Sequence, residues 1–185
     1  MSTHKKINYI LLFAAGFIVI FCAQNLYGFD AMAQYNKAIR YIKMKQPDFA
    51  LMEFRGVARD FPKSVFARKA MFAMAEYYYD NKIYYDAIDN FTRYINDYPK
   101  SKASVFAKAY LLKITQDIKY PSPDEKKAFE TIKNDFFSKP LFLILKEYKK
   151  TSYKSPSLNR FRIKHNPDNN IELYRNNQIF LTLTP

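Results

Sequence analysis

Cysteine is almost absent from this 185-residue chain, and tryptophan is entirely absent. The single cysteine is Cys22, so the chain beyond it has no internal disulfide and depends on its core for stability. Histidine is also scarce, because His4 lies near the N-terminus and His165 is the only other one. These absences exclude zinc sites built on Cys and His. Catalysis by a Ser-His-Asp or Cys-His group would have to use His165.

Glycine is equally rare, with three in the chain and only Gly56 beyond position 28. Few backbone positions can then demand a positive φ, and the sequence has no glycine-rich loop to bind phosphate. This composition favours a mainly helical fold over a glycine-punctuated β fold. Aromatic residues are plentiful instead, with 16 tyrosines and 17 phenylalanines, so we expect them to supply much of the core.

We expect no enzyme activity, no cofactor and no metal. Asp80, Asp86 and Asp89 cluster around one turn, which invites a metal or acid–base interpretation. Solvated helix ends explain the same carboxylates, as a surface position beside a turn explains His165. The formal charge of +13 favours acidic proteins, anionic lipids or acidic glycans as partners, and we expect no nucleic acid.

The N-terminus has the pattern of an export signal. Two lysines precede an apolar run over residues 7–23 that shows no amphipathic stripe. Three outcomes remain open: acylation at Cys22, cleavage after Gly28, or retention of the run as a membrane anchor. In each case residues 1–28 are predicted to target the chain to the bacterial envelope, with its body on the periplasmic side.

A repeat with a fixed offset of 37 residues runs through the body. The segment FALMEFRGVARDFPKS (49–64) aligns with DAIDNFTRYINDYPKS (86–101). The alignment rests on these pairs: Ala50 and Ala87, Phe54 and Phe91, Asp60 and Asp97, Phe61 and Tyr98, Pro62 and Pro99, Ser64 and Ser101.

Each repeat is predicted to contain two helices, because proline, serine caps and turn residues punctuate the apolar stripes. The expected helices span 31–45, 47–61, 65–80 and 84–97, with a degenerate third pair at 104–119 and 122–137 and a short helix at 141–148. The strand-like segments near the C-terminus are separated by Asn-rich turns, which predicts an antiparallel meander.

The predicted fold is therefore mainly α, a tetratricopeptide-like helical-hairpin solenoid with a small C-terminal antiparallel β-meander of three strands. The expected boundaries are a signal or anchor over 1–28, repeats over 30–137 (30–64, 65–101 and 102–137), a short helix and basic connector over 138–157, and the meander over 158–185.

The repeats resemble the tetratricopeptide pattern in order and spacing. The matching pairs are Ala38 and Ala75, Tyr41 and Tyr78, Ala50 and Ala87, Phe54 and Phe91, and Pro62 and Pro99. With an export signal and a cysteine at the lipobox position, residues 30–137 resemble the BamD/ComL-like outer-membrane assembly lipoproteins. The resemblance implies a periplasmic scaffold that holds partners of the β-barrel assembly machine and samples unfolded outer-membrane proteins.

Tetratricopeptide arrays line a concave groove with the first helix of each pair. By helical spacing we predict that these residues face the groove and bind a partner protein: Tyr35, Ile39, Ile42, Lys69, Phe72, Glu76, Tyr79, Phe106, Tyr110 and Lys113. The alternative function is a cell-division or wall-associated factor that contacts peptidoglycan or anionic membrane through the basic stretch 139–164. Such a charge run is also typical of a solvated face.

Overall fold

The structure, a computed structural model, describes residues 28, 30–118, 123, 126, 127, 129, 130, 138–148 and 152–185. The apolar run with Cys22 lies outside these residues, so the predicted signal and lipidation site are not described. Most of the helix predicted over 122–137 also lies outside them, although Phe129 is helical and buried. Within the described ranges, no helix combines the length and apolar character needed to cross a membrane.

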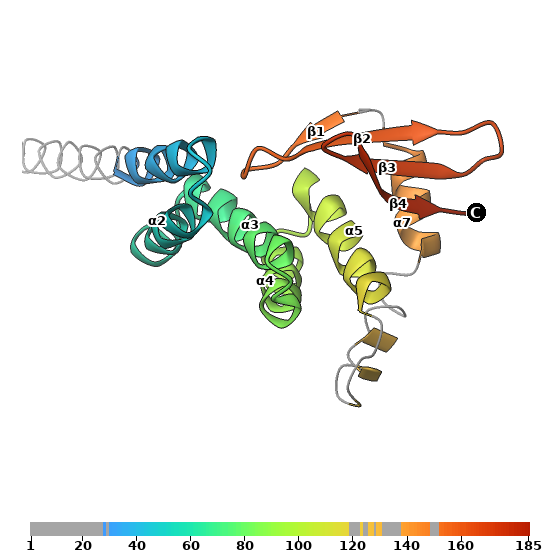
Figure 1. The fold of residues 1–185 in the computed structure, drawn as a ribbon, viewed down its shortest axis with the longest axis horizontal. Helices are drawn as coiled ribbons and strands as arrows, with labels where there is room; N and C mark the ends of the chain where they lie inside the picture. The colour runs from blue at the N-terminus through green and yellow to red at the C-terminus, as the bar shows by residue number, and fades with distance from the viewer. Residues whose placement is uncertain are drawn as a thin grey trace, which may run out of the picture.

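The described helices follow one another along the body of the chain. They are the helix at 30–43, α2 (Pro47–Asp60), α3 (Val65–Asp80), α4 (Tyr84–Asp97), α5 (Lys102–Asp117) and α7 (Ser138–Lys146). From α2 to α5 each helix packs against the next (Figure 1). The turns between them are short, so successive helices run in opposite directions.

Local capping signals explain where these helices start. Ser64 caps α3, its side-chain oxygen accepting from the Ala67 amide at 3.0 Å, as the sequence predicts. The predicted limits of α3 and α4 are both confirmed. Helix α5 begins at Lys102 rather than at the predicted 104, because Ser101 caps it by accepting from the Ala103 amide at 3.3 Å. Helix α7 likewise starts three residues earlier than predicted.

The C-terminal part forms a four-stranded antiparallel sheet in the order β1 (Ser152–Lys154), β2 (Arg160–His165), β3 (Ile171–Arg175) and β4 (Gln178–Leu183). The predicted meander of three strands was one strand short, since β1 lies in the segment expected to be a connector. Three residues are too few to show strand periodicity in a Lys- and Ser-rich stretch. Tyr153 on β1 is held by stacking on Phe106 of α5, with ring centroids 4.2 Å apart.

A β-bulge in β4 directs an additional aromatic side chain toward the helices. Leu173 pairs with Leu181 while Tyr174 pairs with Ile179, so Phe180 is the extra residue between them. Phe180 and Leu181 are consequently both buried, although neighbours on a regular strand point to opposite faces. The bulge therefore fixes how the sheet meets the helical array.

The helices and the sheet share one main hydrophobic core. It joins buried residues of α3, α4, α5, α7 and all strands after β1, with Tyr153 of β1 packed against it. A smaller core lies between the helix at 30–43, α2 and α3. Figure 1 shows the sheet beside α5 with α7 against it, and the β1–β2 turn reaching toward the helix at 30–43. The fold is mainly helical with a small C-terminal antiparallel sheet.

Candidate functional site

The predicted groove residues come from the helix at 30–43, α3 and α5. Four of them, Phe72, Glu76, Phe106 and Tyr110, are 0% exposed. At these positions the open groove that we predicted is filled by the C-terminal sheet of the same chain. The physical reason is aromatic packing across a large sequence separation, which no local pattern encodes.

Tyr110 is the centre of this packing. Its ring stacks on Phe91 of α4 with centroids 4.6 Å apart, and it lies 4.9 Å from the ring of Tyr79. From the sheet, the rings of Phe180 and Phe161 meet it edge-on at 5.0 and 5.7 Å. The sheet is thus attached to the helices by interlocked aromatic rings, a geometry worth about 0.5–1.5 kcal/mol per pair beyond burial.

A buried carboxylate, that of Glu76, completes the attachment. Its Oε1 accepts a hydrogen bond from the Tyr110 hydroxyl at 2.8 Å and another from Asn159 Nδ2 at 3.1 Å. The Ser157 hydroxyl donates to Oε2. Ser157 and Asn159 belong to the β1–β2 turn, so one side chain of α3 binds both α5 and the sheet. We name Glu76, Tyr110, Ser157 and Asn159 the Glu76 cluster.

Arg175, at the end of β3, adds an ion pair to the same contact. Its Nη2 donates to Asp80 Oδ2 at 2.6 Å, and its guanidinium carbon lies 5.6 and 5.5 Å from the ring centroids of Tyr79 and Tyr110. Burial opposes its charge, but Tyr110, Asp80 and Glu76 outweigh that effect and raise the pKa of Arg175. The arginine therefore stays charged beside the Glu76 cluster.

Burial also changes the titration of the carboxylate. Desolvation raises the pKa of Glu76 above its usual 4.5, against the opposing effects of the Ser157 hydroxyl and Arg175. Burial, and then the charge of Glu76, raise the pKa of Tyr110 as well. The Tyr110 hydroxyl consequently remains a hydrogen-bond donor at neutral pH.

This titration gives a prediction for the pH dependence of stability. The folded protein binds a proton at Glu76 more tightly than the unfolded chain does. The stability that this protonation adds is therefore fully present below pH 4.5, and it is lost as the pH rises through the higher pKa of the folded state. In urea denaturation from pH 7.5 to 4, we expect wild type to gain stability relative to Glu76→Gln as the pH falls. A constant difference between the two proteins, or a gain in the opposite direction, would contradict the raised pKa.

The remaining predicted groove residues lie around this contact. The Tyr35 hydroxyl donates to the Pro156 carbonyl at 3.1 Å. Asp117 accepts from the Tyr79 hydroxyl at 2.9 Å and pairs with Lys113 at 2.5 Å. The other three residues, Ile39, Ile42 and Lys69, line two pockets beside the turn 155–159.

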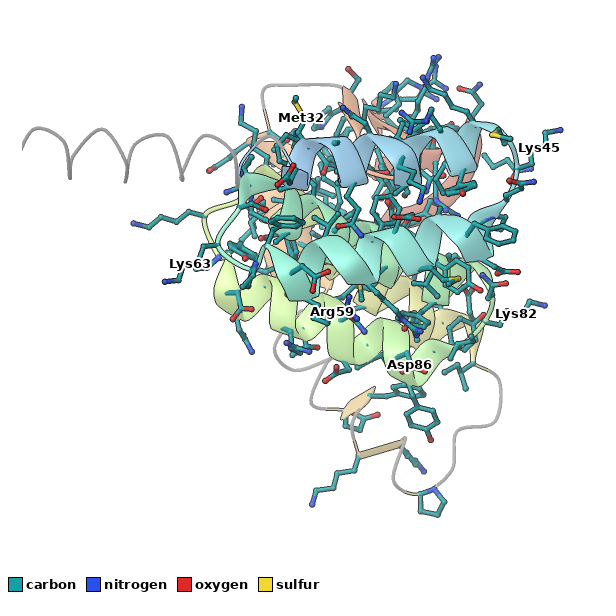
Figure 2. The ribbon with its side chains drawn as sticks, turned by 90° about the vertical axis from the view of Figure 1, so that its left-hand side faces the viewer. Met32, Lys45, Arg59, Lys63, Lys82 and Asp86 are labelled. Atoms are coloured by element: carbon teal, nitrogen blue, oxygen red, sulfur yellow. The ribbon has the colours of Figure 1, made fainter. Side chains whose placement is uncertain are left out.

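The first of these, which we name the distal pocket, has a volume of about 440 Å³. Ile42, Ala50, Leu51, Phe54 and Ala73 form its apolar wall. Its polar rim is formed by Lys45, Asp80, Asn81 and Asn159. In Figure 2, Lys45 and Lys82 mark this end of the helical array, whereas Met32 and Lys63 lie at the opposite end.

The second, which we name the basic pocket, has a volume of about 500 Å³. Four cations line it: Arg68 and Lys69 from the start of α3, Lys102 from the start of α5, and Lys154 from β1. Sequence reasoning missed this grouping, because the four residues come from three separate segments of the chain, in α3, α5 and β1.

The other polar candidates lie at the surface. Asp80 is paired with Arg175, Asp86 and Asp89 are exposed, and His165 is exposed at the end of β2. Within the described residues, no three Cys, His, Asp or Glu side chains form a group that could hold a metal ion.

In the basic stretch, the cations of β2 form a solvent face. Arg160, Arg162 and Lys164 are exposed and alternate with the buried Phe161 and Ile163. Comparison with protein-family models, curated proteins and solved structures gives no match for this chain.

Proposed function

We propose that this chain is a non-catalytic adaptor of the bacterial cell envelope, exported through its N-terminal segment, that binds a partner protein through a tetratricopeptide-like helical array. The 37-residue repeat and helix limits that follow its caps and prolines support this assignment. The resemblance to BamD/ComL-like lipoproteins makes outer-membrane protein assembly the process in which we place it.

The observation that carries the proposal is a set of exposed apolar side chains at the end of the array where the distal pocket lies. Four large apolar side chains flank the two turns at this end, each at least 42% exposed: Met44, Phe49, Ile83 and Tyr85. Exposed apolar residues scattered singly are normal, but several of them at an end of the array that also holds an apolar pocket are typical of protein-binding surfaces. We name these four residues, together with the distal pocket, the distal surface.

The chemistry of the distal surface fits a partner protein that inserts an apolar side chain. The pocket has an apolar wall, and its volume of about 440 Å³ exceeds that of one aromatic or branched side chain. On its polar rim, Asp80 is paired with Arg175 and Asn159 is hydrogen-bonded to Glu76, so the apolar wall is the part that a partner side chain would contact. The concave positions under the sheet are not needed for this mode of binding.

Site-specific photocrosslinking tests the proposal. A benzophenone amino acid at Phe49 is expected to crosslink the full chain to one discrete protein in the producing cells. Val65 is a matched control because it is 48% exposed, against 53% for Phe49, and lies at the opposite end of the array. Met44→Ser with Ile83→Ser should abolish the Phe49 crosslink while leaving thermal stability within about 0.5 kcal/mol.

Three results would count against a distal partner site. They are no crosslink at Phe49, the same products at Phe49 and Val65, or a crosslink that survives the double substitution.

A further inference from the structure

The basic pocket has a charge that its own surroundings do not balance. Arg68, Lys69, Lys102 and Lys154 line it, and none of its lining residues is an aspartate or glutamate. Among the described residues, no carboxylate forms an ion pair with any of these four cations. A concave site with several cations and no acid concentrates anions.

Aromatic rings rather than acids position two of the cations. The Lys69 ammonium lies 5.7 Å from the ring centroid of Tyr35 and 5.2 Å from that of Phe66. The Arg68 guanidinium lies 5.7 Å from the ring centroid of Tyr98, at the end of α4. Cation–π contacts hold these groups in place without neutralising them, so their charge remains available to a ligand.

The pocket lies at the end of the molecule where the helix at 30–43 begins. Tyr35 and Asn36 line it and lie in the second turn of that helix, about 9 Å along its axis from residue 30 at 1.5 Å per residue. Lys63 and Lys100, in the turns before α3 and α5, are exposed at the same end (Figure 2 labels Lys63). In the sequence, the apolar run over 7–23 ends seven residues before residue 30.

We propose that the basic pocket binds the net negatively charged head group of an anionic phospholipid. An apolar run that enters or approaches a bilayer would bring this end of the array next to the head groups, while the distal surface would face away. Anionic lipids attract uncompensated cations that lie next to their head groups. Each Lys or Arg near the membrane surface adds about a five-fold gain in affinity. An acidic protein segment matches the charge but not the position beside the apolar run. The inference rests on the membrane targeting proposed for the N-terminal segment, but it does not depend on the partner proposed for the distal surface.

Native mass spectrometry of the full chain in a non-ionic detergent tests the inference. Phosphatidylglycerol and phosphatidylcholine are titrated separately, so the apolar run contributes equally to both and the head group alone differs. We expect phosphatidylglycerol to bind more tightly. Arg68→Gln with Lys69→Gln should reduce its affinity about 25-fold and leave phosphatidylcholine binding unchanged.

The matched control removes the same charge from the other end. Lys45→Gln with Lys82→Gln, whose positions Figure 2 shows, should retain phosphatidylglycerol affinity within about two-fold. Lys102→Gln with Lys154→Gln is a second test, because both side chains are exposed and their loss leaves the cation–π contacts intact. It should also reduce the affinity about 25-fold.

Three outcomes would overturn the inference. The first is equal binding of the two lipids, which would leave the apolar run as the only lipid contact. The second is an equal loss in the pocket and control variants, which would indicate diffuse charge. The third is displacement of phosphatidylglycerol by an Asp- and Glu-rich peptide at a concentration lower than that of the lipid, which would identify the pocket as a protein site.

Discussion

Replacing Glu76 with alanine is expected to lower the free energy of unfolding by about 3 kcal/mol and to detach the β1–β2 turn from the helices. The substitution leaves the Tyr110 hydroxyl, the Ser157 hydroxyl and the Asn159 amide without their common acceptor. Tyr110 is completely buried, so water can replace the lost carboxylate there only by entering the core. Urea denaturation at pH 7 measures the overall change.

Limited proteolysis reports the local part of the same prediction. Lys154 and Arg160 flank the turn and are exposed, so trypsin should cleave after them faster in Glu76→Ala than in wild type. The matched control is Glu53→Ala, which removes the carboxylate that pairs with Lys37 at 2.7 Å on the outside of the array. The Lys37 side chain of this pair is 49% exposed. The control substitution should therefore lower the free energy of unfolding by less than about 1 kcal/mol and leave cleavage unchanged. Equal losses for the two variants would show that the Glu76 cluster does not attach the sheet.

The limits of α3 and α4 were predictable because their signals are local. Ser64 lies directly before the helix that it caps, and Pro62 and Pro99 each stand just beyond the helix that they follow. The two-residue turn of the last hairpin was equally visible, since Asn176 and Asn177 tolerate the positive φ angles of 50° and 69° that they adopt. Such features depend on neighbouring residues, and one sequence is enough to detect them.

The placement of the sheet was not predictable in the same way. Glu76 meets residues 81 and 83 positions away in the chain, and the bulge that directs Phe180 inward depends on pairing with β3. One signal was nevertheless available: Glu76 interrupts an aromatic stripe between Phe72 and Tyr79 on α3. A charged side chain on an otherwise apolar face requires either water or a buried hydrogen-bond partner. Glu76 was therefore compatible with an open, hydrated groove and equally with an interface covered by another part of the chain.

The two pockets were not predictable for the same reason, because each is lined by segments that are distant in the sequence. Ile39, Ile42 and Lys69 were predicted as groove residues, and they now divide between the distal and basic pockets on either side of the turn 155–159. The aromatic positions of the predicted groove bind the sheet instead. In this fold, the chain uses its own C-terminal strands where we expected a partner, which moves the proposed binding surfaces to the two ends of the array.

Replacing Tyr110 with alanine should have the largest effect of any substitution discussed, a loss of about 5 kcal/mol in the free energy of unfolding. The side chain is fully buried and contacts aromatic rings from α3, α4, β2 and the bulge in β4. Its removal leaves a cavity bounded by rigid rings that cannot easily collapse into it. It also removes a donor to Glu76.

Two further variants separate the ring from the hydroxyl. Tyr110→Phe keeps the packing and loses only the hydrogen bond, so it should cost about 1–2 kcal/mol. Tyr85→Ala removes a tyrosine that is 61% exposed and should stay within about 0.5 kcal/mol of wild type. The three values are measured by chemical denaturation at one pH. A loss in Tyr110→Ala no larger than that in Tyr110→Phe would mean that the ring contributes nothing to stability.

Calorimetry of Tyr110→Ala then decides whether the helices and the sheet unfold together. Because Tyr110 contacts both, a single core predicts that the melting temperature falls while the unfolding remains one transition. If the array instead folds without the sheet, Tyr110→Ala should separate the melting curve into two transitions, with the sheet lost first. The first result would make the sheet an integral part of the domain, since exposing the aromatic groove to a partner would then require the whole domain to unfold.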